Sequence, residues 1–334
     1  MAVLLERITS PADLRSLSYD ELDALAAEIR DFIVRAVSVT GGHLGSNLGA
    51  VELTLAVHRV FDSPRDIVLW DTGHQAYVHK IVTGRRDAFA TLRQGGGLSD
   101  YPSRRESEHD WVENSHASTI LSYAHGLATA VHRSGAERDR RVVAIIGDGS
   151  MTGGMAFEAL NNLGHSGRRA VVILNDNGRS YAPTVSRLTE GVARLRLNPS
   201  YMAVRGRVES ALKELPGLGP IAVSGIKGIR AAFREVLEPM AFFEGLGVRY
   251  SGPIDGHDIA GVESALRNAA EHDGPIVVHV LTQKGRGYPP AEDDDEKCLH
   301  DAPVFDPLTG PPAGWAAPKG YGEAFSQTMI ELAE

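Results

Sequence analysis

The chain has little cysteine and no long apolar run. Its 334 residues contain one cysteine, Cys298, which cannot form an internal disulfide and is typical of a reducing compartment. The longest apolar runs, such as Val142–Ile146, are far shorter than the roughly 18–20 residues of a membrane-spanning helix. Met1–Glu6 leads into polar sequence without the apolar core of a secretory signal. We therefore expect a cytoplasmic protein that does not enter the membrane.

The chain also lacks an excess of basic residues. Lysine and arginine number 34 against 43 aspartates and glutamates, which gives a net charge of −9 and argues against broad binding to nucleic acid. The composition, 43% hydrophobic and 23% charged, is typical of a globular protein with a substantial core. An anionic ligand would have to be held by local groups, since the overall charge is unfavourable to it.

Alternating strand and helix patterns predict a doubly wound α/β fold. Arg141–Ile146 and Ala170–Leu174 are short apolar runs that flank a helical pattern over Gly153–Leu163. Two such strands around one helix are typical of a crossover in a parallel sheet buried on both faces. A second unit combines a strand at Val248–Tyr250, a helix at Ile259–Ala270 and a strand at Ile276–Leu281.

The amino-terminal third is also predicted to contain helices and a strand. Ser18, with Glu21 three residues later, predicts a capped helix start. The remaining elements expected there are a helix over residues 47–61, a strand over 66–70 and a helix over 119–133.

The composition divides the chain into three parts. Residues 1–310 form one large domain, in which 179–234 is a long, partly mobile excursion rich in Arg, Gly and Pro. Residues 311–321 are a proline-rich linker, and 322–334 form an amphipathic helix that would begin a second domain.

One carboxylate and one amide follow the two strands of the first unit. Asp148 lies between Gly147 and Gly149, and Asn177 follows the second strand. Ligands bind at the carboxyl ends of strands in such sheets, and these oxygen donors suit Mg²⁺, which completes its octahedron with phosphate oxygens and water. Neither a P-loop nor a G-x-G-x-x-G fingerprint is present. Each turn alone is an ordinary tight turn, but the pair predicts a site for a metal and a diphosphate.

Histidines in polar loops are the candidate proton carriers. His43, His74 and His116 stand at a strand end or helix start, which favours a functional role, and His300 lies in a later loop. His79 and His257 are candidates for holding the loops in place. The other seven are assigned to the surface or to packing, as are Arg104 and Arg105: His58, His109, His125, His132, His165, His272 and His279.

Five further motifs occur in register with the Gly147-Asp148-Gly149 and Asn177 pair. They are Gly42–Ser46, Trp70–Tyr77, Glu113–Thr119, Pro253–Asp258 and Lys284–Tyr288. Together they resemble the amino-terminal half of the 1-deoxy-D-xylulose-5-phosphate synthases, thiamine-diphosphate enzymes related to the transketolases. The resemblance covers residues 1 to about 310 and implies the diphosphate-binding domain of a transketolase-like architecture.

The resemblance implies a role for each matching residue. Mg²⁺ would be held by Asp148, Asn177 and the backbone carbonyl of Arg179, and the catalytic residues would be His43, His74 and His300. The chain has Ser115-His116-Ala117 where the family often has Gly-His-Ser, which removes one hydroxyl. The residues that would contact the cofactor are His74, Ser115, His116, Ala117, Gly149, Ser150, Asn177, Lys284 and Tyr288.

The implied reaction is decarboxylation of pyruvate and addition of the two-carbon fragment to glyceraldehyde 3-phosphate. In the family, the glutamate that activates the cofactor lies in a following domain, so we expect the chain to need a partner chain, a homodimer, or both. Two alternatives remain open: the amino-terminal subunit of a split transketolase, and a truncated module that binds cofactor or a partner without catalysis. Gly73–Tyr77 and Ser103–His109 favour the synthase over the transketolase.

Overall fold

The computed structural model describes residues 4–135, 139–179, 242–312 and 320–333. Most of the 179–234 excursion and of the 311–321 linker therefore lies outside the described residues. Among the described residues, no helix combines the length and the apolar character that crossing a membrane requires.

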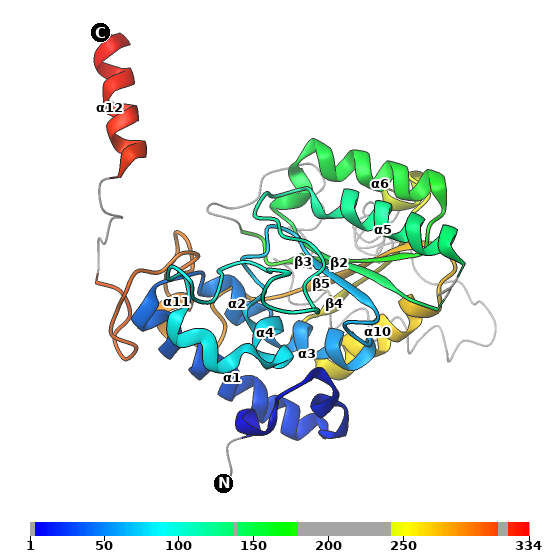
Figure 1. Cartoon of the computed structure of the whole chain (residues 1–334), viewed down its shortest axis with the longest axis horizontal. Coiled ribbons are helices and arrows are strands. Elements are labelled where there is room, and N and C mark those ends of the chain that lie inside the picture. The colour runs from blue at the N-terminus through cyan, green and yellow to red at the C-terminus, as the bar shows by residue number, and fades with distance from the viewer. Residues whose placement is uncertain (1–3, 136–138, 180–241, 313–319, 334) are drawn as a thin grey trace, which may run out of the picture.

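The centre of the fold is a five-stranded parallel sheet (Figure 1). Its strands run in the order β1 (Ile67–Trp70), β2 (Val142–Gly147), β3 (Ala170–Asp176), β5 (Pro275–Leu281) and β4 (Arg249–Asp255). β2 and β3 are direct neighbours, with Gly147 opposite Asn175. The predicted α/β class and both predicted crossover units are confirmed.

Helices cover both faces of this sheet. In Figure 1, α5 (Ile120–Ser134) and α6 (Gly154–Ser166) lie above it, and α1 (Tyr19–Thr40), α3 (Val51–Val60) and α10 (Ile259–Glu271) lie below. Alternate residues of each strand enter one of two hydrophobic cores, because successive side chains of a strand point to opposite faces. In β2, for example, Val143 and Ile145 join the core between the sheet and α1, and Ala144 and Ile146 join the core between the sheet and α5.

The predicted capped start of α1 is confirmed. The backbone N–H of Glu21 donates to the Ser18 hydroxyl at 3.3 Å, and the backbone N–H of Ser18 donates to the Glu21 carboxylate at 2.8 Å. This reciprocal pair satisfies donors that every helix start leaves free. The helix ends at Gly41, which adopts a positive φ of 70°.

Two parts of the amino-terminal third differ from the prediction. The helix expected over 47–61 is two helices, α2 (Gly45–Gly49) and α3, which meet at Ala50. A Cβ at Gly49 would lie 2.7 Å from the Gln283 carbonyl oxygen, so close packing of α2 against that segment accompanies the break. The helical turns α4 (Tyr77–Lys80), η3 (Ile81–Arg85) and η4 (Arg86–Thr91) were not predicted. All four residues of α4 are buried, which leaves no alternation of polar and apolar positions to detect.

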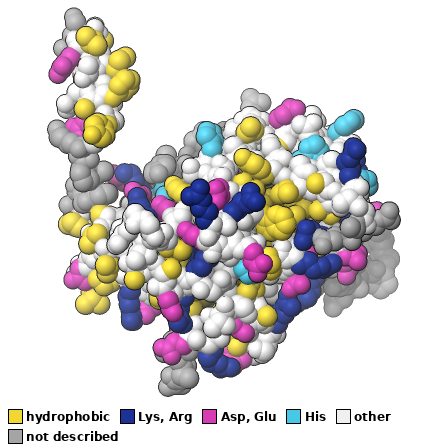
Figure 2. All heavy atoms as spheres, in the orientation of Figure 1, with side chains coloured by type: hydrophobic (Ala, Val, Ile, Leu, Met, Phe, Trp, Pro, Cys, Tyr) yellow, Lys and Arg dark blue, Asp and Glu magenta, His cyan; other side chains and the backbone are white. Residues whose placement is uncertain are grey.

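The remaining elements are short, apart from one terminal helix. They are η1 (Leu4–Arg7), η2 (Pro11–Ser16), η5 (Ser150–Thr152) and α11 (Pro289–Glu292). The predicted helix near the carboxyl terminus is present as α12 (Tyr321–Ala333), and none of its described residues is buried. Figure 2 shows hydrophobic side chains along α12. Phe325 and Met329 are among the exposed hydrophobic residues of this helix. The proposed division into domains remains a prediction.

Candidate active site

The predicted metal pair lies side by side at the carboxyl edge of the sheet. Asp148 is buried just beyond β2, and its Oδ1 accepts the backbone N–H of Asn177 at 3.4 Å. The backbone N–H of Arg179 donates to the Asn177 side-chain oxygen at 3.2 Å. The Arg179 guanidinium hydrogen-bonds the carbonyl oxygens of Asp295 and Glu296. The predicted contact of Arg179 with a metal therefore concerns its backbone carbonyl and not its side chain.

The donor chemistry at this edge fits a hard cation with few protein ligands. Across the described ranges, no group of three or more His, Cys, Asp or Glu side chains is placed to hold a metal ion. One carboxylate, one amide and one backbone carbonyl are oxygen donors of the kind that Mg²⁺ accepts when phosphate and water supply the rest. Mg²⁺ binding by Asp148, Asn177 and Arg179 therefore stays a prediction that the geometry permits.

A second loop reaches this edge from the start of α5. The Ser118 hydroxyl donates to the Ser150 carbonyl at 2.6 Å, which ties the Ser115-His116-Ala117 segment to the loop of Gly149 and Ser150. Ser115, His116 and Ala117 are all exposed, and the His116 ring contacts the Ala117 carbonyl at 2.8 Å. These exposed backbone groups lie beside the loop that follows β2, where the sequence predicts a diphosphate.

Asp71 holds that second loop; the sequence placed it in the Trp70–Tyr77 motif but assigned it no role of its own. Its carboxylate is buried at the end of β1 and accepts the backbone N–H groups of Ser118 and Ile120, each at 3.0 Å. An acidic residue directly after a buried strand was the available signal. Asp71 therefore acts as a cap for the first turn of α5.

The three predicted catalytic histidines come together. The ring centroids of His43 and His74 are 5.4 Å apart, those of His74 and His300 are 5.1 Å apart, and those of His43 and His300 are 5.6 Å apart. Lys284, predicted to contact a cofactor, places its Nζ 2.8 Å from Nδ1 of His300. We call these four residues the histidine cluster.

Backbone contacts between distant segments build the histidine cluster. Gly42 and Ala302 exchange both backbone hydrogen bonds, at 2.9 and 2.8 Å, which brings the segment of His300 beside that of His43. The Asn47 amide donates to the carbonyl oxygens of His43 at 2.7 Å and His74 at 2.8 Å. Asn47 was missed by sequence reasoning, because its importance depends on where two loops meet.

Burial disfavours the charged forms of His74, His300 and Lys284 in the histidine cluster. It lowers the pKa of His74 to about 3, assisted by the charges of His43 and Lys284. The pKa of His300 is lowered to about 2 by burial and then by the charge of Lys284. Burial also lowers the pKa of Lys284 to about 8, against the opposing effect of the Asp148 carboxylate. Nδ1 of His74 is buried and has no hydrogen-bond partner among the described residues, so a polar atom remains for a ligand.

The remaining candidates lie outside the histidine cluster. His79 is fully buried between Asp110 and His58, each at 2.8 Å, and His257 contacts the Glu52 carboxylate at 3.0 Å. Both positions agree with a role in holding loops. Tyr288 lies in the core, where its hydroxyl donates to the Pro307 carbonyl at 3.0 Å, and its contact with a cofactor stays a prediction. Arg104 and Arg105 are exposed.

Comparisons with known proteins show the family to which the chain belongs. Residues 5–282 match the family described as 1-deoxy-D-xylulose-5-phosphate synthase. The chain is 54% identical over 329 residues to such a synthase from Frankia casuarinae, covering 98% of the chain and 50% of that protein. It is 53% identical over 330 residues to one from Mycobacterium avium, covering 99% of the chain and 51% of that protein. The chain thus spans about half the length of these relatives.

Two solved transketolases share the fold. The transketolase from Campylobacter jejuni aligns with a TM-score of 0.60 at 17% identity, over 88% of the chain and 44% of that structure. The transketolase from Leishmania mexicana aligns with a TM-score of 0.56 at 18% identity, over 80% of the chain and 37% of that structure. At this identity the likeness supports the architecture alone.

Proposed function

Because the chain belongs to the 1-deoxy-D-xylulose-5-phosphate synthase family, we propose that it forms the diphosphate-binding part of such an enzyme. The enzyme would condense pyruvate with glyceraldehyde 3-phosphate and release CO₂. The observation that carries the proposal is the pairing of Asp148 with Asn177 at the same sheet edge that receives the loops of the predicted cofactor contacts.

Thiamine diphosphate, when bound, would supply the electron sink that such a decarboxylation requires. On this proposal, Asp148, Asn177 and the Arg179 carbonyl hold Mg²⁺. The backbone of the 115–117 and 149–150 loops, with the dipole of the following helix, would bind the diphosphate. Tyr288 would contact the cofactor.

The histidine cluster would bind and move protons. The low pKa values of His74 and His300 keep both rings neutral at neutral pH, where they would hydrogen-bond bound groups and leave proton transfer to His43. Lys284, with a pKa of about 8, carries a positive charge in most molecules at neutral pH and would attract an anionic group. His43 would face the reacting atoms.

A split transketolase subunit is the second candidate, and sequence similarity favours the synthase. Identity to the two synthases is 53–54%, against 17–18% for the two transketolases. We further propose a cytoplasmic homodimer, or a complex with a second chain that carries the remaining domains. Exposed hydrophobic residues on α12, such as Phe325 and Leu332, support a covering partner or domain.

The function is tested by complementation. The half of the Frankia casuarinae synthase that this chain does not cover would be co-purified with the chain and supplied with thiamine diphosphate, Mg²⁺, pyruvate and glyceraldehyde 3-phosphate. We expect release of CO₂ coupled to formation of 1-deoxy-D-xylulose 5-phosphate, and no product when either half is omitted.

Replacing glyceraldehyde 3-phosphate and pyruvate with transketolase substrates distinguishes a split transketolase subunit from the synthase. Turnover of a ketose donor without CO₂ release would favour the transketolase. Formation of the complex with cofactor bound and no turnover on either substrate set would support the non-catalytic module instead.

A further inference from the structure

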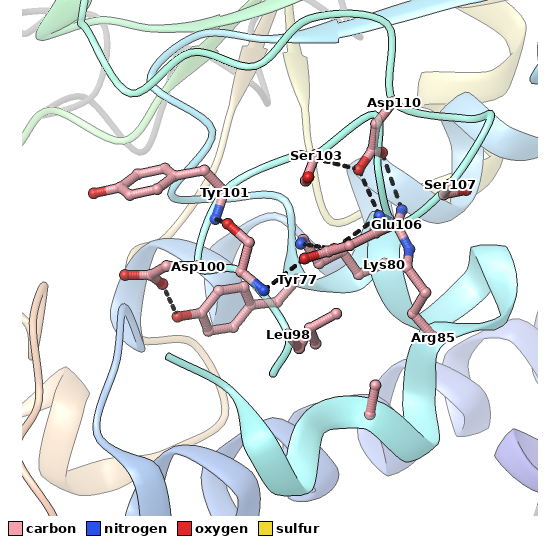
Figure 3. Close-up of polar contacts among 12 residues, drawn as sticks. Tyr77, Lys80, Arg85, Leu98, Asp100, Tyr101, Ser103, Glu106, Ser107 and Asp110 are labelled. Carbon is pink, nitrogen blue, oxygen red and sulfur yellow. Dashed lines mark hydrogen bonds and ion pairs between the residues drawn. The ribbon is translucent and has the colours of Figure 1, made fainter. Parts of the chain in front are cut away.

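Four charged side chains tie down the loop of residues 98–110 (Figure 3). Lys80 and Arg85 come from the helical turns below it, and Glu106 and Asp110 come from the loop itself. Nζ of Lys80 lies 2.5 Å from the Glu106 carboxylate. The Arg85 guanidinium makes two bonds to Asp110, at 2.5 and 3.0 Å. Two positive and two negative charges therefore balance beneath the loop.

The same two carboxylates also hold the loop's backbone. Glu106 accepts the N–H of Ser99 at 2.6 Å, and Asp110 accepts the N–H of Ser103 at 2.7 Å. The side chains of Lys80 and Asp110 are completely buried, so each charge depends on its partner for stabilisation. The loop is fixed on both sides of residues 100 and 101.

Asp100, carried by this loop, reaches the histidine cluster. Its Oδ1 lies 3.1 Å from Nδ1 of His43 and also accepts the Tyr77 hydroxyl. The Tyr77 hydroxyl in turn accepts the backbone N–H of His43 at 3.1 Å. The other carboxylate oxygen lies 3.4 Å from Nε of Arg93. Asp100 and His43 are each about nine-tenths buried, with 11% and 10% of their side-chain surfaces exposed.

These contacts decide which ring nitrogen of His43 carries the proton. Burial opposes the ionised form of Asp100, but hydrogen bonds from His43 and Tyr77 outweigh it and hold its pKa below the usual value. The carboxylate is therefore an acceptor at neutral pH. Burial and the Asp100 charge raise the pKa of Tyr77, so the phenol stays a donor. Nδ1 of His43 must then supply the remaining hydrogen, which leaves Nε2 as the basic atom.

We propose that Asp100 is a positioning residue that fixes His43 in the tautomer protonated at Nδ1, and that the Lys80, Arg85, Glu106 and Asp110 network holds Asp100 in place to do so. This inference rests on the proposed function in one respect only, which is the reaction in which the oriented His43 imidazole would take part. The other groups facing His43 are Tyr77, Tyr101, His74 and His300, and none of them offers a carboxylate to Nδ1.

The tautomer can be measured directly in the chain without cofactor or substrate. Histidine would be labelled with ¹⁵N, and the His43 signals would be assigned by their loss in His43→Asn. Spectra recorded at alkaline pH, where imidazole is neutral, report which nitrogen carries hydrogen. We expect a single Nδ1–H tautomer for His43 in the unaltered chain, and its replacement by a mixture of both tautomers in Asp100→Ala.

Asp301→Asn is the matched control. Asp301 also contacts Arg93, at 3.2 Å, but the carboxylate that meets the His43 ring is that of Asp100, so the His43 tautomer should not change. If Asp100→Ala does not fold, the polar variant Asp100→Ser serves in its place, and unchanged signals of the buried His279, which contacts Tyr250 and Asp176, report a native fold.

Two outcomes overturn the proposal: an Nε2–H tautomer for His43 in the unaltered chain, or retention of the Nδ1–H tautomer in a folded Asp100 variant. Neither depends on cofactor binding, so failure of the proposed function in the complementation assay remains a separate result.

Discussion

A Cβ atom on Gly42 would lie 2.7 Å from the hydroxyl oxygen of Tyr77, closer than real contacts allow. Gly42 also adopts a φ of +147°, a conformation that side chains disfavour. Gly42→Ala should therefore displace Tyr77 and destabilise the chain by about 1–3 kcal/mol in urea unfolding. Gly126→Ala is the control, because Gly126 lies in α5 with open space around it and should gain about 0.5–1 kcal/mol. Equal stability of both variants would contradict the tight contact.

Removal of the Asp148 charge should abolish Mg²⁺-dependent binding of thiamine diphosphate. Asp148→Asn keeps the side-chain shape but removes the only carboxylate of the proposed metal site. Calorimetry with and without Mg²⁺ measures the effect. Asp139→Asn makes the same charge change at the exposed, opposite end of β2 and should leave affinity within a few-fold. Unchanged affinity in Asp148→Asn would remove Asp148 from the metal site.

Stability should fall in acid because His74 resists protonation. Its pKa of about 3 in the folded chain lies below the ordinary value of 6.5, so between these values the unfolded chain binds a proton that the folded chain does not. The contribution of His74 to stability therefore falls as the pH drops from 6.5 to 3, by up to about 1.4 kcal/mol per pH unit. Denaturant unfolding of His74→Gln should show a shallower decline over this range. Parallel curves for the two chains would refute the buried neutral state.

Breaking the ion pair between Glu106 and Lys80 should lower the free energy of unfolding more than breaking an exposed ion pair does. Glu106→Gln leaves a buried lysine without its anion, and we expect a loss of about 3 kcal/mol in urea unfolding. The double variant Lys80→Met with Glu106→Gln should recover part of that loss. Arg15→Met removes the exposed pair with Asp62 and should change stability by less than about 1 kcal/mol. Additive effects of the Lys80 and Glu106 changes would mean that the two are not coupled.

His43→Ala should separate binding from turnover. We expect thiamine diphosphate affinity to stay within a few-fold, since the metal pair is untouched, while turnover in the complemented enzyme falls by roughly 10²–10⁴-fold. His165→Ala, exposed on α6, is the control and should keep full turnover. A His43→Ala enzyme as fast as the unaltered one would take His43 out of the reaction.

The parts of the fold that repeat a local pattern could be predicted from the sequence. The strands around α6 are continuous apolar runs, and the position of Asp148 and Asn177 after these two runs predicts that they lie side by side, as they do. The insertion of β5 between β3 and β4 leaves no such trace, because strand order depends on packing between units.

The histidine cluster could be predicted only in part. His43 and His74 follow from their loop positions and His300 from family resemblance, but their meeting depends on backbone contacts between distant loops. Asn47 and Asp100 act through those loops. No periodicity marks them, since each is one polar residue whose partners are set by tertiary geometry.

The pairing of Gly42 with Ala302 sets the order of events during synthesis on the ribosome. At roughly 5–20 residues per second, His43 leaves the exit tunnel many seconds before the segment that carries His300. Until the segment of His300 and Ala302 has also left the tunnel, the histidine cluster lacks one of its three imidazoles. Any ligand that needs all of these rings could therefore bind only after that segment has emerged.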